Sequence, residues 1–213
     1  SVISLNNLTV NKHAWNGLIV CGTDPCGSSY PGVTSLLVQN SAFIGNHSGA
    51  YFVVKGPVTL LNDAFFSNTG GNGLEIHASS AVTFNHVMAN DNVGYGAYVI
   101  ILGMGVHGNL IALNSLGDNQ FNGNRDGTGL WASVQGSILL TDVYANGNSD
   151  YGLRLDTDWI YGLGITLTGV RAHDNGWTGA RVLARGAIVW TNGGASNNGQ
   201  DAGSPIGGGA DID

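Results

Sequence analysis

Charged residues of the types that cleave polysaccharides occur close together in the stretch ANGNSDYGLRLDTD, residues 145–158. Arg154, Asp156 and Asp158 alternate along a strand-like segment, although only 10% of the chain is charged. Carboxyls at positions i and i+2 of a strand lie about 6.5–7 Å apart. This separation is within the range of about 5–9.5 Å that carboxyl pairs use in glycoside hydrolysis. Together with Arg181, these three residues are the candidate catalytic residues, although D-x-D pairs are common.

The same residues belong to a pattern that repeats along the chain. The phrase Gly–apolar–any–apolar occurs as GLIV at 17, GAYF at 49, GLEI at 73, GAYV at 96, GLWA at 129, GLRL at 152 and GARV at 179. The spacings between these glycines are 32, 24, 23, 33, 23 and 27, which gives a base period near 23 residues. Each phrase follows an Asn-rich turn, and a third short apolar segment such as SAVTFN at 80 lies between phrases. Repetition of this kind indicates stacked structural units.

The composition favours short strands joined by turns. The 213 residues include 35 Gly, 23 Asn and only 4 Pro, and Gly and Asn readily adopt positive φ. Apolar residues alternate within the phrases, and no segment shows a helical stripe. Parallel strands without crossover helices can follow one another only by coiling. We therefore predict an all-β solenoid of seven to eight coils over residues 1–200, with insertions near 21–35, 102–119 and 156–163 and a Gly-rich tail or linker at 201–213.

The G-φ-x-φ strand, the V-T-φ-N strand and the A-N-x-N turn resemble the right-handed parallel β-helix repeats of the pectate-lyase-like superfamily. The resemblance covers about residues 1–200 and implies the fold, but that superfamily includes lyases, glycosidases, epimerases, phage tailspikes, adhesins and structural proteins. Its lyases bind Ca²⁺ through carboxylates and use an Arg or Lys base, and the candidate catalytic residues supply these types. The lyase, polygalacturonase and alginate-epimerase signatures are absent, so we expect no cofactor and no metal site, with Ca²⁺ as the alternative.

The third residue of each phrase is expected to point outward. This places Glu75, Tyr98, Trp131, Arg154 and Arg181 in one row with a rung spacing of about 4.8 Å. Aromatic rings beside charged groups suit the apolar faces and polar edges of sugars. The predicted ligand-binding residues are Glu75, His77, Tyr98, Trp131, Arg154 and the insertion residue Trp159. The alternative is that the exposed rings only stabilise neighbouring strands.

Other recurrent residues are expected to support the scaffold. Five asparagines recur once per coil and are predicted to stack in a hydrogen-bonded ladder: Asn46, Asn68, Asn90, Asn122 and Asn146. Cys21 and Cys26 in CGTDPC are predicted to form a disulfide, because a metal site would need two more soft ligands. Paired cysteines and few charges favour an extracellular or cell-surface location.

These features exclude some functions and leave two open. A net charge of −7 without clustered Lys or Arg argues against nucleic acid, and the apolar run at 99–102 is too short to span a membrane. The leading hypothesis is a non-catalytic structural or adhesive module of a larger surface or secreted protein, which self-associates or binds glycan. The alternative is a polysaccharide lyase or glycosidase that uses the aromatic and charged face. Converging carboxyls in a walled cleft would favour the enzyme, and a flat face would favour the module.

Overall fold

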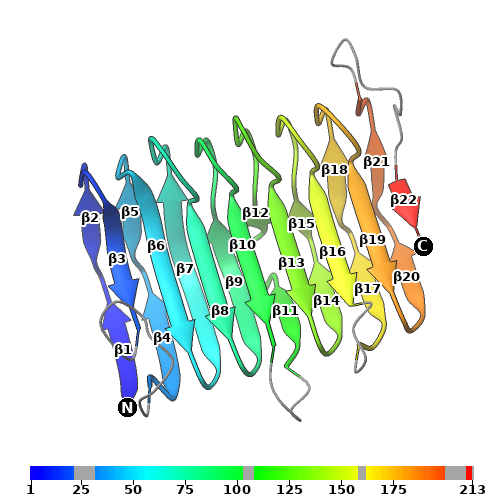
Figure 1. Cartoon of the computed structure of the whole chain (residues 1–213). Helices are drawn as coiled ribbons and strands as arrows, with labels where there is room; N and C mark the ends of the chain where they lie inside the picture. The colour runs from blue at the N-terminus through cyan, green and yellow to red at the C-terminus, as the bar shows by residue number, and fades with distance from the viewer. Residues whose placement is uncertain (22–31, 103–107, 158–161, 200–209, 213) are drawn as a thin grey trace.

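The chain folds as a parallel β-solenoid, as the repeat predicts. The computed structural model describes residues 1–21, 32–102, 108–157, 162–199 and 210–212, and no helix occurs among them. The strands stack side by side from the N-terminal to the C-terminal end (Figure 1). No helix in this described part is long and apolar enough to cross a membrane.

One wall of the solenoid is an eight-stranded parallel sheet, made of the strands that follow the repeated glycines. Its strands are β3 (Asn16–Val20), β6 (Ser48–Val54), β8 (Leu74–Ala78), β10 (Ala97–Ile101), β13 (Leu130–Val134), β16 (Leu153–Thr157), β19 (Ala180–Ala184) and β22 (Ala210–Ile212). Strand β22 lies inside the segment predicted to be a tail and pairs with β19.

The remaining strands form a fourteen-stranded parallel sheet with two arms. Strands β7 and β9 connect the two arms, because each is long enough to pair with strands of both. The first arm contains β1 (Val2–Asn6), β4 (Ser35–Gln39), β7 (Val58–Phe66), β9 (Val82–Met88), β11 (Leu110–Leu113), β14 (Ile138–Thr141), β17 (Ile165–Thr168) and β20 (Ile188–Thr191). The second arm adds β2 (Thr9–Asn11), β5 (Ala42–Ile44), β12 (Asn119–Gln120), β15 (Val143–Tyr144), β18 (Arg171–His173) and β21 (Gly194–Ser196).

Alternation along each strand separates the core from the surface. In β16 the side chains of Leu153, Leu155 and Thr157 are buried, whereas Arg154 and Asp156 between them are partly exposed. The core side chains stack from coil to coil. The rings of Phe43 and Phe65, for example, are parallel within 8° with centroids 5.1 Å apart. The sequence alternation therefore fixes which residues can reach a ligand.

The repeated glycine has a steric cause, which Gly152 illustrates. A Cβ atom at this position would lie 2.5 Å from the carbonyl oxygen of Gly179 and 2.7 Å from Nδ2 of Asn175. Both atoms belong to the next coil, so any larger residue would push two coils apart. The repeated glycine therefore stands where the turn meets the strand and where the backbone of the next coil comes too close for a side chain.

Buried asparagines form a continuous row inside the turns, called here the inner row. Each inner-row Oδ1 accepts from the backbone N–H of its counterpart in the preceding coil, as between Asn92 and Asn124 at 3.1 Å. Each Nδ2 donates to a backbone carbonyl, as Asn124 does to Ala89 at 3.3 Å. The inner row comprises Asn46, Asn68, Asn92, Asn124, Asn148, Asn175 and Asn198.

The five predicted ladder asparagines are divided between two rows. Asn46 and Asn68 belong to the inner row. Asn90, Asn122 and Asn146 instead form a half-buried outer row, in which each Oδ1 accepts from the backbone N–H of the next coil at 2.8 Å. The correction follows from the A-N-x-N turn, which contains two asparagines, of which the second points inward.

Candidate functional site

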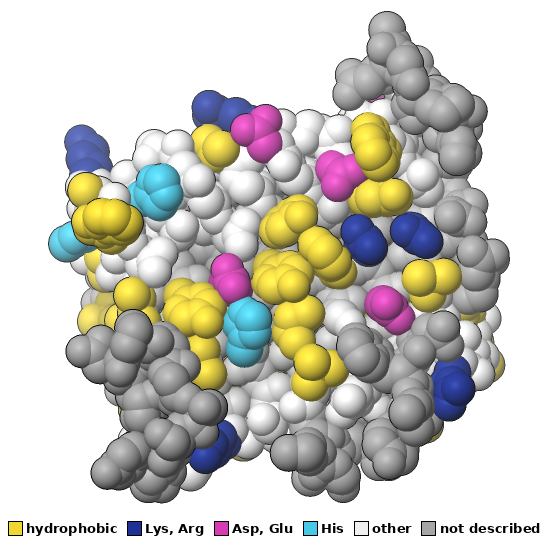
Figure 2. Space-filling model, in the orientation of Figure 1, with side chains coloured by type: hydrophobic (Ala, Val, Ile, Leu, Met, Phe, Trp, Pro, Cys, Tyr) yellow, Lys and Arg dark blue, Asp and Glu magenta, His cyan; other side chains and the backbone are white. Residues whose placement is uncertain are grey.

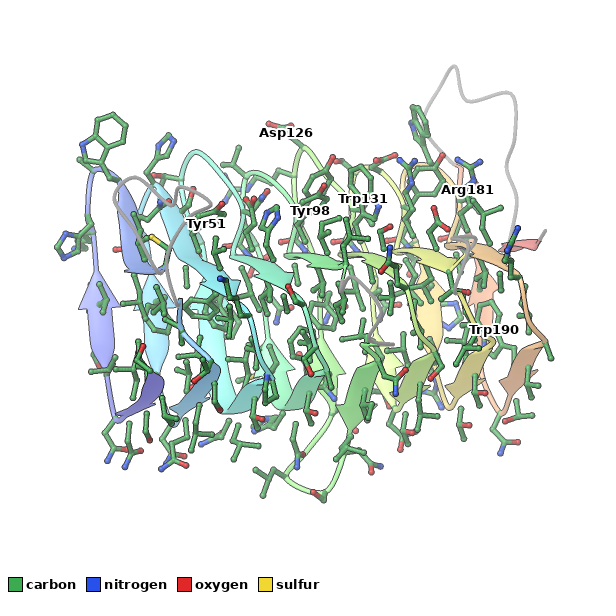
Figure 3. All side chains as sticks on the ribbon, turned by 60° about the horizontal axis from the view of Figure 1, so that its bottom comes forward. Tyr51, Tyr98, Asp126, Trp131, Arg181 and Trp190 are labelled. Carbon is green, nitrogen blue, oxygen red and sulfur yellow. The ribbon has the colours of Figure 1, made fainter. Side chains whose placement is uncertain are left out.

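Outward residues of the eight-stranded sheet form one row across its strands. The register pairs Glu75 with Tyr98, Tyr98 with Trp131, Trp131 with Arg154 and Arg154 with Arg181. Tyr51 extends the row beyond Glu75. In Figure 3, Tyr51, Tyr98, Trp131 and Arg181 lie along the same outer surface of the solenoid.

Five rings near the centre of this row are in contact and are called here the aromatic face: Tyr51, His77, Tyr95, Tyr98 and Trp131. Tyr98 meets Trp131 edge to face with centroids 4.9 Å apart, and Tyr95 lies 5.7 Å from Tyr98 and 5.3 Å from Trp131. His77 links Tyr98, at 6.0 Å, to Tyr51, at 5.6 Å. Figure 2 shows apolar and histidine side chains gathered over the middle of this sheet, without a deep cleft among the described residues.

Arg154 covers part of the aromatic face. Its guanidinium carbon lies 4.3 Å from the centroid of the Trp131 ring, which is cation–π geometry. One face of the indole is therefore occupied by the arginine and is not an open platform for a sugar. The guanidinium is in turn held at a fixed place, where its remaining N–H groups can donate to a ligand.

Glu75 and His77 form a polar pair between the tyrosines. Oε1 of Glu75 lies 2.8 Å from Nε2 of His77, and Oε2 accepts a hydrogen bond from Nδ2 of Asn72 at 3.1 Å. The side chains are 29% and 37% exposed, so a ligand can still reach them. Burial, followed by the charge of Glu75, raises the pKa of Tyr51 above its ordinary value.

Asp150 is the main residue of this region that sequence reasoning missed. Its Oδ2 accepts a hydrogen bond from the hydroxyl of Thr128 at 3.2 Å, whereas its buried Oδ1 has no hydrogen-bond partner among the described residues. Burial raises the pKa of Asp150, and the bond from Thr128, the charge of Arg154 and the backbone N–H of Tyr151 oppose this rise. The pKa of Tyr95 is raised by burial and then by the charge of Asp150, whereas the charge of Arg154 lowers it. Tyr95, Asp150 and Arg154 are therefore electrostatically coupled.

The proposed pair of catalytic carboxyls stays a prediction, because only Asp156 of the pair lies in the described part of the chain. Asp156 lies one outward position beyond Arg154 on β16, where its register partners are Ser133 and Leu183. Asp158 and Trp159 lie outside the described residues, and so does Cys26, so the Cys21–Cys26 disulfide stays a prediction. Within the described ranges, no group of three or more His, Cys, Asp or Glu residues is placed to hold a metal ion.

A comparison of the chain with protein-family models, with curated proteins and with solved structures finds no match in any of the three.

Proposed function

We propose that the chain is a non-catalytic extracellular module that adheres to glycans through the aromatic face. The single observation that carries this proposal is the contiguous cluster of five rings beside a fixed arginine. Sugars present apolar C–H surfaces to ring edges and faces and hydroxyls to the groups around them. The flat sheet offers such contacts over several successive rungs, which suits an extended chain of sugars.

Polar groups at one border of the cluster and within it supply the directional contacts. Asp150 is only half-buried, so its carboxyl can accept a hydrogen bond from a sugar hydroxyl at this border. Arg154 offers donors next to it, and the Glu75–His77 pair lies between Tyr51 and Tyr98. Donors and acceptors beside and between the rings match the alternating polar and apolar surfaces of a glycan.

The module proposal is tested with a glycan array and a matched set of variants. Trp131→Ala and Tyr98→Ala remove rings of the aromatic face and are expected to weaken binding about fivefold to thirtyfold, as for a central contact residue. Tyr144→Ala is the control. The guanidinium carbon of Arg171 lies 5.6 Å from the centroid of the Tyr144 ring, so Tyr144 also has a cation–π contact, but it lies on the other sheet. Equal binding by all three variants, or no binding by the wild type, would refute the proposal.

A second candidate function is a polysaccharide lyase or glycosidase, which Asp150 favours. A half-buried carboxyl with a raised pKa near an arginine is the kind of group that donates a proton to a leaving oxygen. The chemistry would need a second group, and Arg154 is a basic residue close enough for its charge to lower the pKa of Asp150. Release of new reducing ends or unsaturated sugars by the wild type, abolished in Asp150→Asn, would replace the module proposal by this one.

Self-association is part of the module proposal. Core-type side chains on the first and last strands are only partly covered, among them Ile3 and Leu18 at one end and Ile188 and Trp190 at the other. A second copy stacked end to end would cover these side chains and continue the parallel ladders. Sedimentation velocity over a range of protein concentrations tests this, and a single monomeric species throughout would exclude it.

A further inference from the structure

A hollow of about 380 Å³ lies on the turns that lead from the fourteen-stranded sheet to the eight-stranded sheet. Three successive turns contribute to it, the ones that precede β13, β16 and β19. It is distinct from the aromatic face, whose residues do not line it. Its volume is within the range of about 300–1,000 Å³ that is typical of small-ligand sites.

The hollow is open in front of Gly147, where a side chain is missing, whereas an added Cβ at Gly123 in the preceding coil would lie 2.5 Å from Oδ1 of Asp91. The residue just before each inner-row asparagine has positive φ, and other coils place Ser67, Asp91, Asp174 or Asn197 there. Only Gly123 and Gly147 leave this position without a side chain in two successive coils within the described ranges. A Cβ atom at Gly147 would meet no atom within 4 Å, so the space in front of this glycine is open.

Three side chains give the hollow its chemistry. Arg125 can only donate hydrogen bonds, ionised Asp174 can only accept them, and Ser149 can do both. The asparagine amides behind them are already used, because Asn148 donates to Phe121 and Asn175 and accepts from Asn124. One positive and one negative group face a shared space, so the formal charge of the lining is zero.

We infer that this hollow is a second binding site, for a single neutral sugar ring. Hydroxyls both donate and accept, so one ring can donate to Asp174 and accept from Arg125 and Ser149. A uronic acid would be attracted by Arg125 but repelled by Asp174, and an amino sugar the reverse, so a charged sugar gains no net attraction here and loses more hydration than a neutral one. The inference goes beyond the adhesive function and does not depend on whether the aromatic face binds a glycan.

The test is a titration of ¹⁵N-labelled protein with neutral methyl glycosides, followed by backbone amide shifts. We expect the amides of Gly123, Gly147 and Gly176 to move with saturable, weak affinity. Glucuronate and glucosamine serve as charged comparisons and are expected to bind more weakly than the neutral sugars. No shift at these three glycines up to the solubility limit of the sugars, or tighter binding of a charged sugar, would overturn the inference.

Gly147→Asn separates this hollow from the rest of the surface. Asparagine already has this backbone conformation at Asn197, where φ is 54°, so the variant fills the hollow without backbone strain. We expect it to abolish the shifts of Gly123 and Gly176. Gly45→Asn is the matched control, because Gly45 has the same positive φ and its added Cβ would meet only Cγ of Lys12, at 3.8 Å.

Two further variants keep the test independent of folding. Arg125→Ala and Asp174→Asn change exposed side chains, and each is expected to weaken binding about threefold to tenfold by removing one hydrogen bond. Unchanged binding in Gly147→Asn, or in both of these variants, would refute the site. Loss of array binding in Trp131→Ala with intact shifts at the three glycines would separate the two sites.

Discussion

The two rows of asparagine predict very different costs for two substitutions only two residues apart. Asn124 belongs to the inner row, and its Oδ1 accepts from the backbone N–H of Asn92 at 3.1 Å while its Nδ2 donates to the carbonyl of Ala89 at 3.3 Å. Alanine would leave both buried backbone groups without these partners. At about 1–3 kcal/mol for each unsatisfied group, Asn124→Ala should cost roughly 2–6 kcal/mol of unfolding free energy.

Asn122 in the outer row provides the matched comparison. Its Oδ1 accepts one hydrogen bond, from the backbone N–H of Asn146 at 2.8 Å, and both residues are half-buried. Water can replace this bond, so Asn122→Ala should cost only about 0.5–1.5 kcal/mol.

Denaturant unfolding followed by both circular dichroism and tryptophan fluorescence measures the two costs. Both probes are needed because a repeat protein can lose cooperativity when a central coil is weakened. Hydrogen exchange of the Asn92 amide gives a local readout, which should accelerate in Asn124→Ala and stay slow in Asn122→Ala. Equal costs for the two variants, or a cost below about 1 kcal/mol for Asn124→Ala, would refute the assignment of the inner row.

Three further predictions concern the scaffold. Burial raises the pKa of Asp63 to about 7, although hydrogen bonds from the backbone N–H groups of Ser41 and Leu61 oppose this rise. Between the ordinary aspartate pKa of the unfolded chain and this raised value, the folded protein therefore binds a proton that the unfolded chain has released. Stability should therefore fall by roughly 4 kcal/mol from about pH 4 to about pH 8, and the difference in unfolding free energy between wild type and Asp63→Asn should change over this range; a constant difference would contradict it. Gly152→Ala should cost about 1–3 kcal/mol in thermal unfolding, because its Cβ would meet the next coil, whereas Gly194→Ala, with no atom within 4 Å, should be nearly neutral. Phe65→Ala should cost about 3–5 kcal/mol in urea unfolding by removing a fully buried ring, against about 1 kcal/mol or less for the half-buried Phe66→Ala.

The fold could be predicted because stacking imposes one rule on every coil. Alternation in GLRL places Leu153 and Leu155 inside, and the recurring glycine is required by the backbone of the next coil. The same rule places Trp131 beside Arg154, since equal positions in successive phrases become register partners. Each of these relations depends only on the period, which is visible in the sequence.

The inner row could not be assigned from the sequence because both asparagines of the A-N-x-N turn recur with the same period. In ANGN the two are Asn146 and Asn148, and the choice depends on the residue between them. Gly147 has a φ of 64°, which turns the chain so that Asn148 points inward. The pattern reveals that a ladder exists, whereas the backbone conformation decides which residue forms it.

Asp150 could not be predicted because its surroundings come from other coils. Thr128 lies 22 residues earlier, and the coupled Tyr95 belongs to the coil before that. In the sequence, Asp150 is one polar residue in a turn rich in such residues. Contacts of this kind depend on turn lengths, which vary between coils even where the strands keep the period.

The solenoid does not require a carboxylate at the position of Asp150. Two residues before the repeated glycine, neighbouring coils carry Gly127 and Trp177, so stacking does not demand a carboxylate there. The bond from the Thr128 hydroxyl to Oδ2 links this carboxylate to the preceding coil, but its buried Oδ1 has no hydrogen-bond partner among the described residues, which is unfavourable for folding. Proteins retain such groups where binding or chemistry compensates for the lost stability. The location of Asp150 beside Arg154 and the aromatic face therefore argues that this border of the eight-stranded sheet is a binding surface.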